Sequence, residues 1–160
     1  MKNENKAVWS TRFNKPTSKI FEKIGASIDI DKRLFEEDIL ASIVHAQMLM
    51  KQKIISRKRG SKIINGLKKV RKEIRKNKFK FNKKYEDIHL NIEKRLFSII
   101  GKDAGYLHIA RSRNDQVITD FKLWIKKASK EIVKNLNNLI KSFLKKSEVN
   151  IQTIMPGFTH

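Results

Sequence analysis

Apolar residues recur at helical spacing in four segments of the chain. The first segment covers residues 32–51, and a repeat of three to four positions there predicts a helix with one wide buried face. Its apolar positions are Phe35, Ile39, Leu40, Ile43, Val44 and Met48. Asp29 or Asp31 is placed to cap the start of this helix. Residues 1–25 lack the repeat, which predicts an irregular arm anchored by Trp9 and Phe13.

Two further helices are predicted in the middle of the chain. One covers residues 56–75 with Ser56 as its N-cap, and the other begins near Asp87 and ends at Gly101, a residue suited to a left-handed C-terminal cap. Their apolar stripes are Ile63, Leu67, Val70 and Ile74 in the former and Ile88, Ile92, Leu96 and Ile99 in the latter. Gly60, Gly66 and like charges weaken the helix at 56–75, so packing must hold it. Residues 76–84 alternate, which we interpret as an extended connector that turns Phe79 and Phe81 inward.

The fourth segment is the longest. Its repeat runs from Asp115 to about Lys146, roughly 30 residues and about 45 Å of helix. A helix of this length is typical of an extended helical bundle. Its apolar stripe must be covered by partner helices along its whole length. The three shorter helices cannot cover it, so we expect partners from elsewhere in the protein or from other subunits. The predicted fold class is all-α.

The charge balance points to a possible polyanion partner but does not require one. The chain has 37 Lys and Arg against 16 Asp and Glu, a net charge of +21. Such a charge suggests nucleic acid or an anionic membrane as a partner. Lys, Ile, Asn and Phe are abundant together throughout the chain, as codon bias toward A and T would produce. The basic residues are therefore spread along the chain and not gathered on one face, so we expect no specific nucleic-acid partner. No run reaches membrane-spanning length, and the N-terminal residues lead into no apolar segment, so we expect a soluble chain that is not exported. Without cysteine, and with four scattered histidines, we expect no metal site and a cytoplasmic location.

Polar groups gather in the loop His108–Gln116. It carries two arginines, two carboxamides, a carboxylate, a hydroxyl and an imidazole, with Asn114 or Asp115 where a helix N-cap belongs. Guanidinium forks and exposed backbone N–H groups suit an anionic small molecule. Composition alone does not distinguish this anion-binding loop from a solvated basic loop with an ordinary helix N-cap. His89 and Glu93, one helical turn apart, could face a pocket or form a surface hydrogen bond.

Several segments together resemble the N-terminal portion of the argininosuccinate lyases, members of the fumarase and aspartase superfamily. They are Trp9–Phe13, Ala26–Ile28, Asp31–Asp38, Glu86–His89, Asn91–Leu96, Leu107–His108, Ala110–Gln116 and Met155–His160. The run Ser-Arg-Asn-Asp-Gln is highly specific to that family. The resemblance implies an N-terminal helical lyase domain over residues 1–112 and the start of a central helical bundle over 113–160.

The resemblance also implies an activity. The family cleaves argininosuccinate to arginine and fumarate by anti elimination without a cofactor, in homotetramers whose sites draw on three subunits. Residue by residue, His160 resembles the catalytic histidine. The substrate-binding positions correspond to Ser27, Asn114 and Thr159, and Arg113, Gln116 and His89 correspond to residues that line or support the pocket.

The chain departs from the family pattern at some positions. Ser10 and Thr11 stand where the family usually has two glycines, Gly25 where it has Asn, and Ile109 where it has Thr. The family's mobile loop, which supplies the serine base, follows much later than His160. We therefore expect an N-terminal part that is inactive alone. The alternative is a basic helical remnant that binds RNA or an intact lyase subunit.

Overall fold

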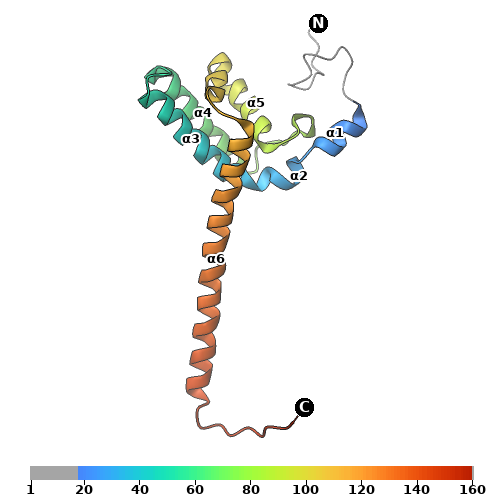
Figure 1. The fold of residues 1–160 in the computed structure, drawn as a ribbon, viewed down its shortest axis with the longest axis vertical. Helices are drawn as coiled ribbons and strands as arrows, with labels where there is room; N and C mark the ends of the chain where they lie inside the picture. The colour runs from blue at the N-terminus through green and yellow to red at the C-terminus, as the bar shows by residue number, and fades with distance from the viewer. Residues whose placement is uncertain (1–17, 160) are drawn as a thin grey trace. The chain divides into compact units, whose positions relative to one another are not determined.

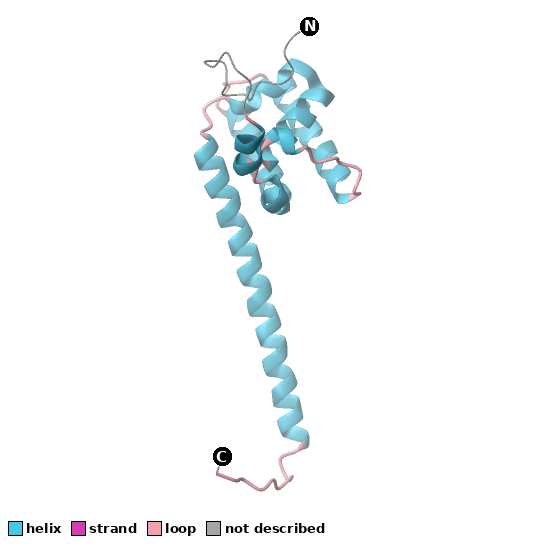
Figure 2. Cartoon of the chain, turned by 90° about the vertical axis from the view of Figure 1, so that its right-hand side faces the viewer, coloured by secondary structure: helices cyan, strands magenta, loops and turns pink. Residues whose placement is uncertain are grey.

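The computed structural model describes residues 18–159, in which the chain forms helices, turns and loops and no strand (Figure 2). The all-α prediction is confirmed for this range. The elements are α1 (Lys19–Gly25), α2 (Ile28–Asp31), η2 (Lys32–Leu34), α3 (Phe35–Lys51), α4 (Arg57–Arg75), η3 (Lys83–Tyr85), α5 (Ile88–Ile100), η4 (Gly101–His108) and α6 (Arg113–Val149). The helix α1 corrects the prediction of an irregular arm to residue 25, and the predicted anchors Trp9 and Phe13 lie outside the described residues.

The chain divides into two compact units, one extending to Phe121 and the other beginning at Lys122. In the first unit, α3 packs against α4 and α4 against α5 (Figure 1). The core side chains include Ile39, Leu49, Ile63, Leu67, Val70, Ile92 and Leu96, all buried. Each such side chain contributes about 1.5–3 kcal/mol on burial, which holds these short helices together. The predicted domain boundary at residues 112 and 113 remains a prediction.

The start of α3 differs from the prediction. Two short helical turns, α2 and η2, precede it, and neither Asp29 nor Asp31 caps it. Asp31 instead accepts the backbone N–H of Ile88 at 3.2 Å and the hydroxyl of Ser27 at 2.6 Å. Its carboxylate therefore serves the N-terminus of α5, where unpaired N–H groups need an acceptor.

The buried face of α3 is narrower than predicted. Leu40 and Val44 are half exposed, at 50% and 55%, and Met48 is also exposed. The inward positions are held partly by polar residues, because Asp38 and Ser42 are buried beside Ile39. Counting apolar residues alone therefore misplaces part of the inner face of this helix.

The helix at 56–75 is confirmed as α4, with Ser56 Oγ accepting the Arg59 N–H at 3.3 Å. Gly66 does more than weaken it. A Cβ at Gly66 would lie 2.5 Å from Leu96 Cδ1 on α5, so the glycine permits close approach of the two helices. Ion pairs across the helices add to the packing, since Glu36 on α3 binds both Arg71 and Arg75.

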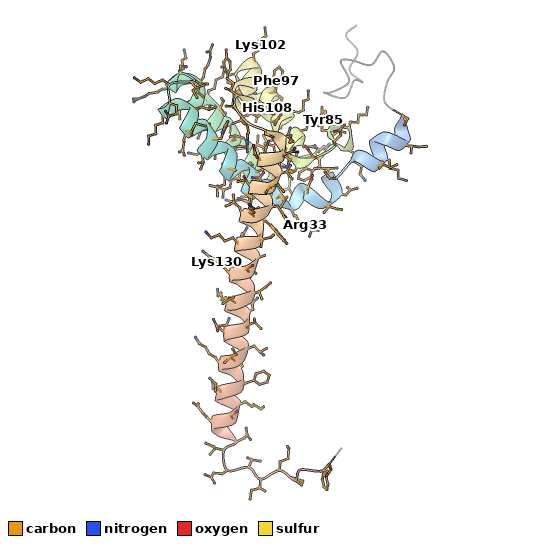
Figure 3. All side chains as sticks on the ribbon, viewed as in Figure 1. Arg33, Tyr85, Phe97, Lys102, His108 and Lys130 are labelled. Carbon is orange, nitrogen blue, oxygen red and sulfur yellow. The ribbon has the colours of Figure 1, made fainter. Side chains whose placement is uncertain are left out.

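The connector and α5 follow most of the prediction. Phe79 packs against the core, whereas Phe81 is 37% exposed and its ring contacts that of Phe79, with 4.9 Å between the ring centroids. Asp87 caps α5 by accepting the Leu90 N–H at 2.6 Å. Gly101 ends α5 with a φ of 69°, a value that favours glycine. Side chains such as Phe97 and Lys102 point outward here (Figure 3).

The second unit consists of the rest of α6 and a tail without helix. α6 is confirmed as the longest element, with 37 residues, which corresponds to about 55 Å. Its apolar side chains in this unit are mostly exposed: Ile132, Leu136, Leu139, Ile140, Phe143 and Leu144 each exceed half exposure. Figure 3 shows Lys130 projecting from the same stretch. Among the described residues, no helix combines the length and apolar character needed to cross a membrane.

Candidate functional site

The loop after η4 is fastened to α3 by two hydrogen bonds. His45 Nε2 donates to the backbone oxygen of Ile109 at 2.9 Å, and Arg111 Nη1 donates to Ser42 Oγ at 2.8 Å. Ala110 between them has a φ of 53°, so the chain turns sharply there. At position 109 the contact with α3 uses the backbone carbonyl, which any residue supplies.

The helix α6 begins earlier than predicted. Its first residue is Arg113, so Asn114 and Asp115 lie in the first turn and neither is the N-cap. The backbone N–H of Gln116 bonds to the Ser112 oxygen at 3.1 Å, which closes that turn. Asn114 is exposed. Its carboxamide therefore faces solvent at a helix N-terminus, where the helix dipole favours an anion.

A buried carboxylate links the loop to α5. Asp38 Oδ1 accepts from Gln116 Nε2 at 2.5 Å and from His89 Nδ1 at 2.9 Å, and Arg111 Nη2 lies 4.0 Å away. Burial alone would raise the pKa of Asp38, but the His89 hydrogen bond, the positive charges and Gln116 hold it below the ordinary value. The same bond raises the pKa of His89 against the opposing effect of burial.

A second carboxylate lies beside this pair. Asp120 on α6 is fully buried, its Oδ2 lies 3.5 Å from His89 Nδ1, and a ligand oxygen of Asp120 lies within 4.8 Å of one on Asp38. Among the described residues, no donor reaches either oxygen of Asp120. Burial and then the charge of Asp38 raise the pKa of Asp120 to about 8. Asp120 is therefore protonated at neutral pH.

A path of polar contacts leads from this buried cluster to the surface of the loop. Gln116 Oε1 accepts from Arg113 Nη1 at 3.0 Å, and Arg113 Nη2 lies 3.0 Å from Glu93 Oε1. Glu93 in turn lies 3.9 Å from His108 Nδ1. The prediction of a surface hydrogen bond between His89 and Glu93 is wrong, because His89 is buried against Asp38 and Glu93 pairs with Arg113, whereas their place near a substrate pocket stays a prediction. The loop is thus an anchored element and not a freely solvated one.

The other predicted site residues are more dispersed. Ser27 is exposed, and its backbone N–H and that of Ile28 each bond to the Glu86 oxygen at 2.9 Å, which places Ser27 beside the start of α5. Thr159 is exposed and belongs to the second unit. His160 lies outside the described residues. The structure therefore brings together His89, Arg113 and Gln116, with Ser27 near the same end of α5.

The sequence interpretation missed Asp38, Ser42 and Asp120. A signal was present, since Asp38 and Ser42 are four residues apart on the face that continues to Ala46 and Leu49, all of them buried. Asp120 likewise follows Gln116 by four residues, and these two are the buried positions of α6. Polar residues on a helical face that is otherwise apolar indicate a buried network.

Asp38, His89 and Asp120 each offer one atom to a possible cation, all within 4.8 Å of one another. The arrangement fits hydrogen bonding better than coordination. Asp38 Oδ1 already accepts two hydrogen bonds, from Gln116 and His89, which uses both of its lone pairs. Three protein ligands with one oxygen already engaged fall short of a closed metal site.

Comparison with known proteins agrees with the loop chemistry. Residues 11–160 match a family model described as lyase. A protein of Pelagibacter ubique strain HTCC1062 named argininosuccinate lyase is 66% identical over 161 residues, covering 100% of this chain and 35% of that protein. Proteins of the same name from Bartonella bacilliformis and from Ehrlichia ruminantium strain Welgevonden are 48% and 49% identical, each over 96% of this chain and 33% of their own length. The chain thus spans about a third of the length of these relatives.

Proposed function

The chain belongs to the lyase family whose model spans residues 11–160, and on that premise we propose that it supplies part of an argininosuccinate lyase site. The reaction is the cleavage of argininosuccinate to arginine and fumarate. The observation that carries the proposal is the anchored loop, in which Asn114 is exposed at the first turn of α6 while Gln116 is bonded to buried Asp38. The 66% identity to the Pelagibacter protein over the whole chain supports it.

The elimination needs fixed donors for a developing negative charge. A base removes a proton beside a carboxylate, the electrons move onto that carboxylate, and an acid protonates the departing guanidinium. We assign carboxylate binding to Asn114, Ser27 and Thr159, whose uncharged groups donate or accept hydrogen bonds. His160 is assigned to proton transfer, because imidazole titrates near neutral pH. The contacts of Arg113, Gln116 and His89 support roles in holding the loop.

The finer proposals concern assembly and location. We propose a homotetramer with sites shared between subunits, which the exposed apolar side chains of α6 support, since Ile132, Leu136 and Phe143 need covering. We also propose that the reaction requires no cofactor and occurs in the cytoplasm. The absence of cysteine agrees with a reducing compartment.

The experiment is a chimera in which this chain replaces the aligned 35% of the Pelagibacter relative. Fumarate release from argininosuccinate is followed by absorbance after expression in a host lacking the enzyme. We expect turnover, and we expect Asn114→Ala to lose about 2–4 kcal/mol of transition-state stabilisation, as loss of an oxyanion-type donor does. Asn65→Ala, at an exposed position of α4, is the matched control. A chimera that assembles but never releases fumarate contradicts the proposed activity, and equal rates for the two variants remove Asn114 from the site.

A further inference from the structure

We propose that Asp120 is a positioning residue that shares one proton with Asp38 and thereby holds Gln116 and Arg113 in place beneath the Asn114 loop. This inference rests on the proposed function for its effect on catalysis. The proton sharing itself is a property of the buried cluster, independent of any activity.

The first step of the argument is that Asp120 cannot remain an unpaired carboxylate. It is fully buried, and no described donor reaches its oxygens. His89 Nδ1 is the nearest cationic atom at 3.5 Å from Oδ2, but its hydrogen is directed to Asp38 at 2.9 Å. An ionised carboxylate without donors in a dry interior is strongly unfavourable, whereas a protonated one can donate to the neighbouring carboxylate.

The second step concerns which carboxyl carries the proton. Asp38 accepts from both His89 and Gln116, so its ionised form is stabilised by donors. Asp120 lacks such donors and therefore takes the proton. The hydrogen bond from Asp120 to Asp38 then completes the donors around the charged carboxylate, in the manner of two acids that share one proton.

The surrounding charges agree with this assignment. The groups that face Asp120 are Asp38 from α3, His89 from α5 and Arg111 from the loop. His89 is also influenced by Asp87 and Arg113, and Arg111 by Glu93. With Asp120 neutral, the one buried negative charge on Asp38 faces His89, whose pKa is raised by the Asp38 hydrogen bond against the effect of burial, and the guanidinium of Arg111. Ionisation of Asp120 adds a carboxylate within 4.8 Å of the first, and the two repel.

The third step links the proton to the loop. Asp38 Oδ1 accepts a hydrogen bond from Gln116 Nε2, and Gln116 Oε1 accepts one from Arg113 Nη1 at 3.0 Å. Asn114 lies between these two residues in the first turn of α6. If Asp120 ionises, its charge repels the Asp38 carboxylate and attracts His89 away from Asp38. Either movement loosens the contacts that support Asn114. A shift of about 1 Å in a site can cost about 100-fold in rate.

The structural test uses the 160-residue chain with carbon-13 in its aspartate carboxyl groups, and NMR follows each resonance with pH. Asp120→Asn assigns the resonance of interest by its loss, and Asp103→Asn, which alters the surface pair with Lys62, is the control. We expect the Asp120 carboxyl to be protonated at about pH 6 and to ionise only well above neutrality. An Asp120 resonance already ionised at about pH 6 overturns the proposal. So does a resonance that responds to one equivalent of added zinc, which would indicate a metal site.

The catalytic test uses the chimera. Asn is the neutral isostere of protonated Asp and can donate to Asp38, so we expect Asp120→Asn to retain activity near neutrality while Asp120→Ala loses about 100-fold, mainly in kcat. Above the ionisation midpoint, we expect activity of the unchanged chimera to fall by about tenfold per pH unit relative to Asp120→Asn. Parallel pH profiles for the unchanged chimera and Asp120→Asn overturn the positioning role. An inactive chimera contradicts the proposed function alone, because the carboxyl titration still decides the proton sharing.

Discussion

Replacing Asp120 with Asn should change how the stability of the chain depends on pH. The folded-state pKa of Asp120 is raised to about 8, above the ordinary value of 3.8 that the unfolded chain has. Between those values the folded chain holds one proton that the unfolded chain releases. The free energy of unfolding therefore contains a contribution that is fully present below about pH 4 and is lost as the pH rises through about 8. Asn at this position neither binds nor releases that proton.

The magnitude follows from one proton. A difference of one bound proton changes the free energy of unfolding by about 1.4 kcal/mol per pH unit. From about pH 5 to about pH 7, the unchanged chain should thus lose up to about 3 kcal/mol relative to Asp120→Asn. Full burial of Asp120 means that little solvent screening reduces this value. The lowered pKa values of Glu36 and Glu73 contribute at more acid pH and are common to both chains.

Other titrating groups can be separated by the choice of pH. His89, whose pKa is raised, stabilises the fold below about pH 6.5 and loses that effect as the pH rises through its folded value, which has the same sign as Asp120. His45, whose pKa is lowered by burial, has the opposite sign up to about pH 6.5. His45 cancels in the difference between the two chains. The interval from about pH 5 to about pH 6.5 therefore isolates Asp120.

The assay is urea unfolding of the 160-residue chain and of Asp120→Asn, followed by circular dichroism at several pH values. Asp103→Asn serves as the control, because its carboxylate is partly exposed and pairs with Lys62 and Arg59. Its difference from the unchanged chain should be constant over the interval. A constant difference for Asp120→Asn as well would refute the reasoning, since it would mean that Asp120 is already ionised in the folded chain.

Three further outcomes are expected. Gly66→Ala should destabilise the chain by up to about 2 kcal/mol, because a Cβ there would lie 2.5 Å from Leu96 Cδ1 and this crowding outweighs the gain in helix propensity; a neutral or stabilising effect in urea unfolding contradicts this. Glu36→Gln should cost about 1 kcal/mol or less, because Arg71 and Arg75 are partly open to solvent, and a cost that persists undiminished in high salt argues against a solvent-screened ion pair. RNA binding, measured by fluorescence anisotropy, should be weak and decline steeply with salt; selective binding at physiological salt would favour the RNA-binding alternative.

The helices were predictable because their apolar side chains pack on one another. The stripe of Ile63, Leu67, Val70 and Ile74 faces the core as the spacing predicts, and Ser56 and Asp87 cap their helices. These features depend on contacts between neighbours in the sequence and on burial of one face. Leu40 and Val44 follow the same rule and are exposed nonetheless. Periodicity indicates which residues share a face but not whether another element covers it.

The buried cluster was less accessible to prediction because its members come from four places in the chain. Asp38 and Ser42 lie on α3, His89 on α5, Arg111 in the loop and Asp120 on α6. Each alone is an ordinary polar residue on a helix or loop. Only the packing of α3, α5, the loop and the first turns of α6 brings these polar groups together, and no local rule predicts that meeting.

The contacts of Gln116 separate the residues that hold the loop from those that can meet a ligand. Gln116 is 3% exposed, its nitrogen donates to Asp38, and its oxygen accepts from Arg113. Both ends of the carboxamide are therefore committed within the protein. Asn114, two residues earlier, has the same functional group and is exposed. The same functional group in one short run is thus buried and bonded at Gln116 but exposed to solvent at Asn114, so only Asn114 has a carboxamide free to meet a ligand. A ligand that approaches the first turn of α6 meets Asn114 on a backbone whose position depends, through Gln116 and Asp38, on the proton of Asp120.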